Sequence, residues 1–247
     1  MNLKKTIETE YKTVDSSLTK EIPIKEEEHF LTDYLREWNT NELSPYISAQ
    51  KILKKITYTK EDITSFSVYL SHLENEIDLS FVGIFFSVLI NEHFKKIKNQ
   101  IATKLRGIDT KGTINNSLPY KIITSHLETE IDNLGNRNNG AHVEIIGDAG
   151  YNLGANMQDG EIVVYGNCLS PVGFFMHHGK ITVKKAGDEF GKGLQGGTLF
   201  AEETGILCGE KMQKGTIHIA EEYNFGKHGM LLAAGGEIYF NNKKMYP

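Results

Sequence analysis

The sequence predicts an α+β protein of two modules, in which an N-terminal helical domain is followed by a β-solenoid of about six rungs. From Gly147 onward the sequence repeats itself with a period of 18 to 19 residues, and twenty of its 24 glycines lie after residue 139. A fixed period of this size is typical of a solenoid, in which each repeat stacks on the next. Residues 26–105 instead carry apolar residues at helical spacing.

Each repeat combines a turn glycine with apolar residues at fixed offsets. The turn glycines are Gly160, Gly179, Gly197 and Gly215. Three residues before them stand Met157, Met176, Leu194 and Met212, and after them follow the pairs Ile162/Val164, Ile181/Val183, Leu199/Ala201 and Ile217/Ile219. Residues two apart in a strand point to the same side, so the pairs predict an inward column of aliphatic side chains. Stacking must supply the stability, because one rung is too small to bury a core alone.

Two irregular rungs flank these four copies. Val143 and Ile145 open the solenoid, and Ile238 and Phe240 close it after an insertion at 225–234. Irregular terminal repeats are the caps expected of such a fold. The solenoid therefore spans 140–240.

The helical domain is predicted to hold four helices over 26–105. Phe30 to Trp38 form the first, and the second is capped by Ser44 and begins at Pro45. The third opens at Thr59 with Asp62 three residues on, which places an acid in its first turn. The fourth spans 79–105. Its apolar run of ten residues at 81–90 is too short to cross a bilayer.

The remaining segments have other compositions. Residues 1–25 are polar without a sustained period, so we expect partial disorder there. Residues 106–139 are predicted to form a linker and a cap. The linker is 106–119, which is rich in Gly, Asn and Ser, and 120–139 could form a short helix over the first rung. The tail 241–247 is polar, and its lysines are expected to keep other chains from pairing with the open end.

The sequence of residues 147–167, GDAGYNLGANMQDGEIVVYGN, resembles the GXGXG repeat. That repeat is found in the C-terminal domain of the glutamate synthase large subunit and in one of the subunits of formylmethanofuran dehydrogenase. Over about 140–240, the resemblance implies a right-handed, single-stranded parallel β-helix that holds catalytic domains or subunits in place.

The chain also departs from those families. Residue 2 is Asn2 instead of a nucleophilic cysteine, and Cys168 and Cys208 are too few for the iron–sulfur ligands of a glutamate synthase. The resemblance therefore carries over a fold and no enzymatic role.

Composition narrows the class of protein further. The net charge of −5 falls entirely in the second half, because residues 1–121 hold equal numbers of basic and acidic residues, and no basic stripe indicates nucleic-acid binding. No secretory signal is seen, so we expect a cytoplasmic protein without membrane contact. The two cysteines occupy different places in their rungs, which argues against a disulfide.

No motif assigns a catalytic, cofactor-binding or metal-binding residue. His177 and His178 are adjacent in a predicted turn, where neighbouring side chains point apart and would not share a metal ion. The segment 187–193 has a Gly-x-Gly character, but it belongs to the repeat.

One surface is a candidate interaction site. The strand positions between the inward pairs should form an outward row, whose members are Val163, Thr182, Phe200, His218 and Tyr239. Left bare, this row would be a contiguous, largely apolar patch, so we expect the helical half or a partner to cover it.

The leading functional hypothesis is a non-catalytic scaffold or protein-interaction module, which binds a protein partner or a second copy of itself. One alternative is a structural subunit of an oxidoreductase or amidotransferase complex. Another is a hexapeptide-type acyltransferase, whose coils also use about 18 residues. That class needs aliphatic residues every six positions, whereas Ile162 and Val164 are two apart.

Overall fold

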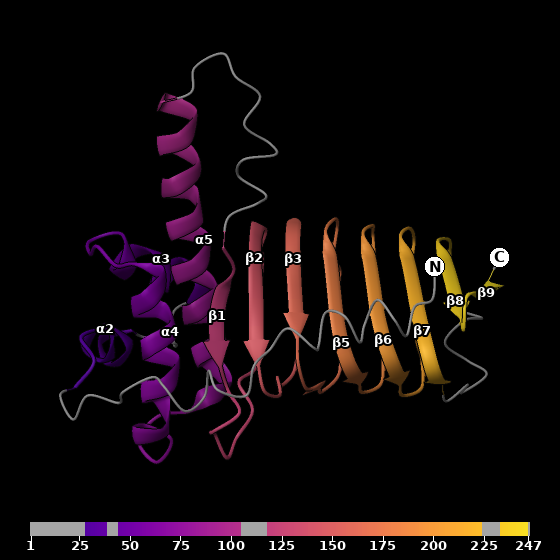
Figure 1. The fold of residues 1–247 in the computed structure, drawn as a ribbon, viewed down its shortest axis with the longest axis horizontal. Coiled ribbons are helices and arrows are strands. Elements are labelled where there is room, and N and C mark those ends of the chain that lie inside the picture. The colour runs from indigo at the N-terminus through magenta and orange to yellow at the C-terminus, as the bar shows by residue number, and fades with distance from the viewer. Residues whose placement is uncertain (1–27, 39–43, 105–117, 224–232, 247) are drawn as a thin grey trace.

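A computed structural model describes residues 28–38, 44–104, 118–223 and 233–246. It confirms the predicted fold class, because four helices precede a parallel β-solenoid of about six turns (Figure 1). The predictions for 1–25, for 106–117 and for most of the insertion at 225–234 lie outside the described residues.

The helices begin close to where the sequence predicts. They are α2 (Leu31–Glu37), α3 (Pro45–Leu53), α4 (Lys60–Tyr69), which runs into the short 3₁₀ helix η1 (Leu70–His72), and α5 (Leu79–Lys104). Thr59 and Asp62 form a complete capping box at the start of α4. Ser44 takes the position before α3, but its side chain makes no capping hydrogen bond among the described residues.

Aromatic side chains fill the helical core. Phe66 on α4 packs against Phe85 and Phe86 on α5, with ring centroids 6.1 and 5.5 Å apart. Trp38 lies against Phe85 at 5.7 Å. These residues belong to the same continuous cluster of buried side chains as the solenoid interior, so the two modules share one core.

The solenoid has one long strand per turn. The strands are β1 (Tyr120–Ile123), β2 (Asn139–Ile146), β3 (Asp159–Val164), β5 (Lys180–Ala186), β6 (Thr198–Thr204), β7 (Thr216–Tyr223) and β8 (Glu237–Phe240). They pair in parallel in this order, and the two-residue β4 (Asn167–Cys168) also pairs with β5. Figure 1 shows them side by side, with the helices at the β1 end.

The predicted inward columns are buried as expected. The aliphatic pairs from Val143/Ile145 to Ile217/Ile219 have no exposed surface, and neither do Met157, Met176, Leu194 and Met212. A further buried column, which was not predicted from the sequence, runs through Leu134, Leu153, Val172, Phe190 and Cys208.

Glycine is required where this last column turns. Gly154 has φ +64°, a conformation that costs other residues energy. A Cβ there would also lie 2.4 Å from Cδ1 of Ile181, one coil further on. Position 154 is therefore closed to larger residues by both its backbone and its packing.

The helical module caps the first rung. Thr64 Oγ1 on α4 donates a hydrogen bond to the Lys121 carbonyl at 3.0 Å, and Ser67 Oγ accepts one from the Ile123 N–H at 2.9 Å. On α5, a Cβ at Gly83 would lie 1.8 Å from the Asp132 carbonyl oxygen, so helix and loop touch directly. The short helix considered for 120–139 is wrong: this segment begins with β1, one strand earlier than predicted.

The tail closes the other end. Residues 243–246 form β9 (Lys243–Tyr246), which pairs antiparallel with β8. Asn241 and Asn242 both have positive φ, 47° and 60°, as a two-residue hairpin turn of type I′ requires. Lys244 and Glu237 form an ion pair at 2.6 Å across the hairpin. The lysines of the tail were expected to keep other chains from pairing with the open end. The tail does more than this, because it pairs with the last rung itself.

Among the described helices, none is long and apolar enough to cross a membrane.

Candidate functional site

The predicted outward row exists as a single register of the sheet. Val163 pairs with Thr182, Thr182 with Phe200, Phe200 with His218, and His218 with Tyr239. These side chains lie on the side of the sheet that faces away from the solenoid core, here called the outward face. The row falls into an exposed part and a covered part.

The exposed part is a stack of aromatic rings. The rings of Phe200 and His218 are 4.7 Å apart and 8° from parallel, and those of His218 and Tyr239 are 5.0 Å apart and 15° from parallel. We call these three residues the aromatic stack. The rings face one another, so the stack presents mainly their half-buried edges to its surroundings.

Charged groups border the aromatic stack. Lys180 Nζ lies 5.3 Å from the Phe200 ring centroid, which is a cation–π distance. At the other end, the Tyr239 hydroxyl donates a hydrogen bond to Glu237 Oε2 at 2.8 Å, and this bond raises the pKa of Tyr239. Burial lowers the pKa of His218, against the opposing charge of Glu237. Burial therefore favours the neutral form of the middle ring over its protonated form.

The covered part consists of Val163 and Thr182. Val163 is 5% exposed and Thr182 is 1% exposed, although both point out of the sheet. From the sequence, either the helical half or a partner was expected to provide such cover. The main contacts of the described helices with the solenoid are instead those of α4 on β1 and of α5 on β2, at the end of the molecule (Figure 1).

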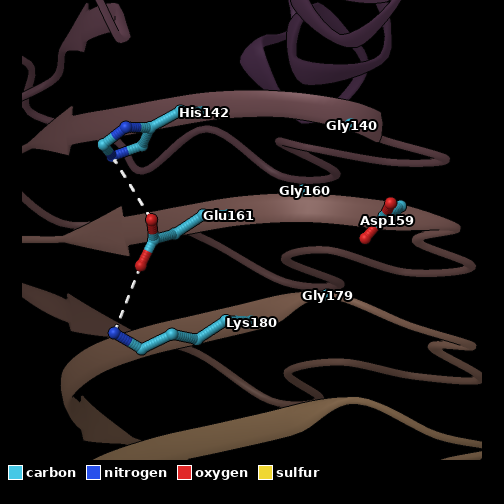
Figure 2. Close-up of a pocket in the computed structure, with 7 residues that line it drawn as sticks. All are labelled: Gly140, His142, Asp159, Gly160, Glu161, Gly179 and Lys180. Carbon is cyan, nitrogen blue, oxygen red and sulfur yellow. Dashed lines mark ion pairs between the residues drawn. The ribbon is translucent and has the colours of Figure 1, made fainter. Parts of the chain in front are cut away.

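A polar hollow lies beside the row, over the starts of β2, β3 and β5 (Figure 2). Its volume is about 280 Å³, and it is lined by Gly140, His142, Asp159, Gly160, Glu161, Gly179 and Lys180. Glu161 is its centre, with Lys180 Nζ at 3.2 Å and His142 Nε2 at 4.0 Å. His142 Nε2 also lies 4.0 Å from a second carboxylate, that of Glu144.

This polar row was not predicted from the sequence. His142, Glu161 and Lys180 recur at the period of 19 residues, and the last two stand two positions before members of the outward row. The spacing alone could have placed them side by side. It could not have shown that Lys180 and Glu161 form an ion pair, because that depends on the side-chain conformations.

A buried polar cluster joins the helices to β1. His93 Nδ1 and the Tyr120 hydroxyl are 2.9 Å apart, and Lys60 Nζ lies 4.3 Å from the Tyr120 ring centroid. Burial raises the pKa of Tyr120, and burial together with the charges of Lys60 and Lys96 lowers the pKa of His93. Tyr120 is only 1% exposed. Its hydroxyl is thus out of reach of a substrate, and the cluster serves packing between the modules.

Two adjacent histidines and the two cysteines lie elsewhere in the solenoid. His177 and His178 are in the turn before β5, and Cys168 and Cys208 are buried, unpaired thiols. Burial raises the pKa of both thiols. Within the described ranges, no group of three or more His, Cys, Asp or Glu residues is placed to hold a metal ion.

Comparison with known proteins gives no relative: no family model, no curated protein and no solved structure matches the chain.

Proposed function

We propose that this protein is a non-catalytic scaffold whose outward face binds a protein partner through the aromatic stack. The observation that carries the proposal is the parallel stacking of Phe200, His218 and Tyr239 on consecutive strands. A stack built on a rigid sheet loses little conformational entropy on binding, so its exposed edges are a favourable surface for association. Aromatic residues are also enriched among those that dominate protein interfaces.

The charges beside the stack support the same role. Lys180 and Glu237 stand at its two ends, and a partner with the complementary pattern would be held in one register. Lys180 already pairs with Glu161, so the face is close to neutral locally and disfavours a strongly charged ligand such as nucleic acid.

The proposal is tested by purifying the tagged full-length protein from its native host. The double variant His218→Ala, Tyr239→Ala is compared with the unchanged protein and with His178→Ala, which removes a histidine from a turn outside the outward face. We expect a stoichiometric partner to be retained by the unchanged protein and the control. The double variant should lose it by about tenfold or more, as for truncated hot-spot residues. Equal retention by all three proteins would contradict the proposal.

A second candidate is a structural subunit of an oxidoreductase or amidotransferase complex. The sequence of residues 147–167 and the parallel solenoid favour this candidate, since both agree with the GXGXG resemblance. Flavin and iron analysis of the same purified sample decides between the candidates. Stoichiometric redox or amidotransferase subunits would favour the second candidate, and a cofactor-free partner would favour a general scaffold.

The acyltransferase alternative is less well supported. Within one coil the inward side chains are Leu153, Met157, Ile162 and Val164, so their spacings are four, five and two residues. Hexapeptide coils need an inward aliphatic residue every six positions. A cytoplasmic location stays part of the proposal, to be checked by cell fractionation.

A further inference from the structure

We propose that the partner of the outward face is a second copy of this chain, which packs its own outward face against the first across a two-fold axis. The axis runs parallel to the strands, midway between β6 and β7, so that β5 of each copy faces β8 of the other. This assignment rests on the proposed function, because it names the occupant of the same surface. It follows from the way in which charge is placed at the two ends of that surface.

A row of polar side chains runs beside the aromatic stack, two residues before it on each strand. Its charged ends are Lys180 on β5 and Glu237 on β8, and Thr198 and Thr216 stand between them on β6 and β7. Side chains two residues apart on a strand share a face, so this row and the stack lie side by side on the outward face. One end of the surface thus carries a basic group and the other an acidic one.

Each charged end is an ion pair that continues onto the next strand. Lys180 pairs with Glu161 on β3 at 3.2 Å, and Glu237 pairs with Lys244 on β9 at 2.6 Å. Lys244 is on the outward face because it stands opposite Tyr239 in the closing hairpin. All four charged side chains are between 31% and 44% exposed. From the stack outward, the order of charge is therefore basic then acidic at one end, and acidic then basic at the other.

This order of charge is self-complementary under the proposed axis. With β5 facing β8 of the second copy, Lys180 faces Glu237 of that copy. One strand further from the stack, Glu161 faces Lys244, and both contacts recur on the other side of the axis. A two-fold axis perpendicular to the strands would instead place Lys180 against Lys180 of the second copy. Like charges repel across an interface, so the pattern selects the axis parallel to the strands.

The aromatic stack lies at the centre of this arrangement. Phe200 on β6 faces His218 on β7 of the second copy, so that the exposed ring edges of the two copies meet around the axis. Sheets that pack face to face keep their strands roughly aligned, as an axis parallel to the strands requires. The surface is only four strands wide, which is small for a stable interface, so we expect a weak dimer with a dissociation constant in the micromolar range.

The test measures self-association of the purified full-length chain by sedimentation equilibrium over a range of concentrations. One variant exchanges the ion pair at the β5 end, by Glu161→Lys and Lys180→Glu. A second variant exchanges the pair at the β8 end, by Glu237→Lys and Lys244→Glu. Each variant keeps its net charge and an ion pair at the exchanged end, but places like charges across the axis. We expect each variant alone to dimerise about tenfold more weakly than the unchanged chain, or less.

Mixing the two variants is the decisive measurement. In a dimer of one variant with the other, the exchanged ends face each other and the unchanged ends face each other, so the charges are complementary at both. We therefore expect the mixture to dimerise with an affinity close to that of the unchanged chain.

The control variant exchanges an ion pair of the helical module, by Arg36→Glu and Glu76→Arg. This pair is 2.9 Å long and similarly exposed, at 44% and 54%. Its exchange should leave the dissociation constant of the dimer unchanged. Far-ultraviolet circular dichroism checks that each variant is folded.

Three outcomes would overturn the inference. The unchanged chain could stay monomeric up to millimolar concentration. It could form a dimer that neither exchange weakens, which would place the contact on another surface. Finally, the mixture could dimerise no more tightly than the separate variants. In each case the proposed function still stands if the native-host purification yields a different protein whose retention depends on His218 and Tyr239, and it fails with the inference if no retained protein depends on them.

Discussion

The carboxylate of Asp148 accepts a hydrogen bond from the backbone N–H of Asn167 at 2.6 Å, and so links one coil of the solenoid to the next. The same link joins Asp132 to Tyr151 at 2.7 Å and Asp188 to Ile206 at 2.8 Å. The residue before each N–H is a glycine, and in all three a Cβ would lie 2.0 to 2.2 Å from the aspartate oxygen. Asp and Gly therefore form a unit across the coils, with Gly leaving room for the carboxylate.

Replacing Asp148 should weaken this link. Asp148→Ala leaves the Asn167 N–H without its acceptor, and we expect a loss of about 1 kcal/mol in the free energy of unfolding, because the site is open to water. Asp148→Asn keeps an oxygen in place and should lose less. Urea unfolding at neutral pH measures both. Equal stability of the alanine variant and the unchanged protein would show that the link contributes nothing.

Gly154→Ala tests the packing of glycine against the aliphatic column. The variant combines an unfavourable φ of +64° with a Cβ 2.4 Å from Ile181 Cδ1, so we expect a loss of about 2–4 kcal/mol in thermal or urea unfolding. Gly187→Ala is the control, since its nearest non-neighbouring atom would be 3.1 Å away, and it should cost less.

A second substitution separates the two causes at this position. Ile181→Val removes the clashing Cδ1 atom, so the double variant with Gly154→Ala should be less destabilised than the sum of the two single variants. If the losses of the two single variants add exactly in the double variant, the whole cost of Gly154→Ala comes from its backbone conformation.

The stability of the protein should fall as the pH is lowered from about 7.5 to about 5.5. Burial, together with the charges of Lys60 and Lys96, lowers the pKa of His93 in the folded protein. As the pH falls through this range, His93 is therefore protonated in the unfolded chain at a higher pH than in the folded one. Proton uptake by the unfolded chain favours unfolding, and the stability is therefore lost below the unfolded pKa of about 6.5.

The variant His93→Asn measures this contribution. Its urea midpoint should change less with pH than that of the unchanged protein. Some dependence should remain, because burial also lowers the pKa of His29, His126 and His218. If the urea midpoint of the His93→Asn variant changes with pH as steeply as that of the unchanged protein, His93 does not cause the loss of stability.

The closing hairpin should depend on its turn. Asn242 has φ +60°, which glycine adopts freely and a β-branched residue does not. We expect Asn242→Val to raise the hydrogen-exchange rate of the β9 amides by about tenfold, and Asn242→Gly to leave it unchanged or lower. Equal exchange in the two variants would mean that the turn does not hold β9 in place.

The repeat made most of this fold predictable. A strand at Ile181 and Val183 and a turn at Gly179 follow from local spacing, and the same spacing sets the register of Phe200 beside His218. The spacing predicts the outward row, but not the stacking of its rings. Periodicity fixes which residues are neighbours along the solenoid, because the rise from coil to coil is constant.

What lay outside the repeat was harder to predict. β1 at 120–123 has the two-residue alternation of a strand, but it is too short to distinguish from a helical turn by pattern. The hairpin at Asn241 and Asn242 had a local signal, since two asparagines tolerate positive φ. The contact of Gly83 with the Asp132 loop joins residues 49 positions apart, and no local pattern specifies such an encounter.

The two closed ends give the solenoid a defined length. α4 occupies the free edge of β1, and β9 occupies that of β8, so neither end offers an unpaired strand of the repeat for indefinite polymerisation. A duplication or loss of one coil between them would leave both ends intact and would displace them by about 4.8 Å, the spacing of neighbouring strands. The length of the solenoid thus changes in whole coils, and the distance between its helical end and its aromatic stack is set by the number of repeats between them.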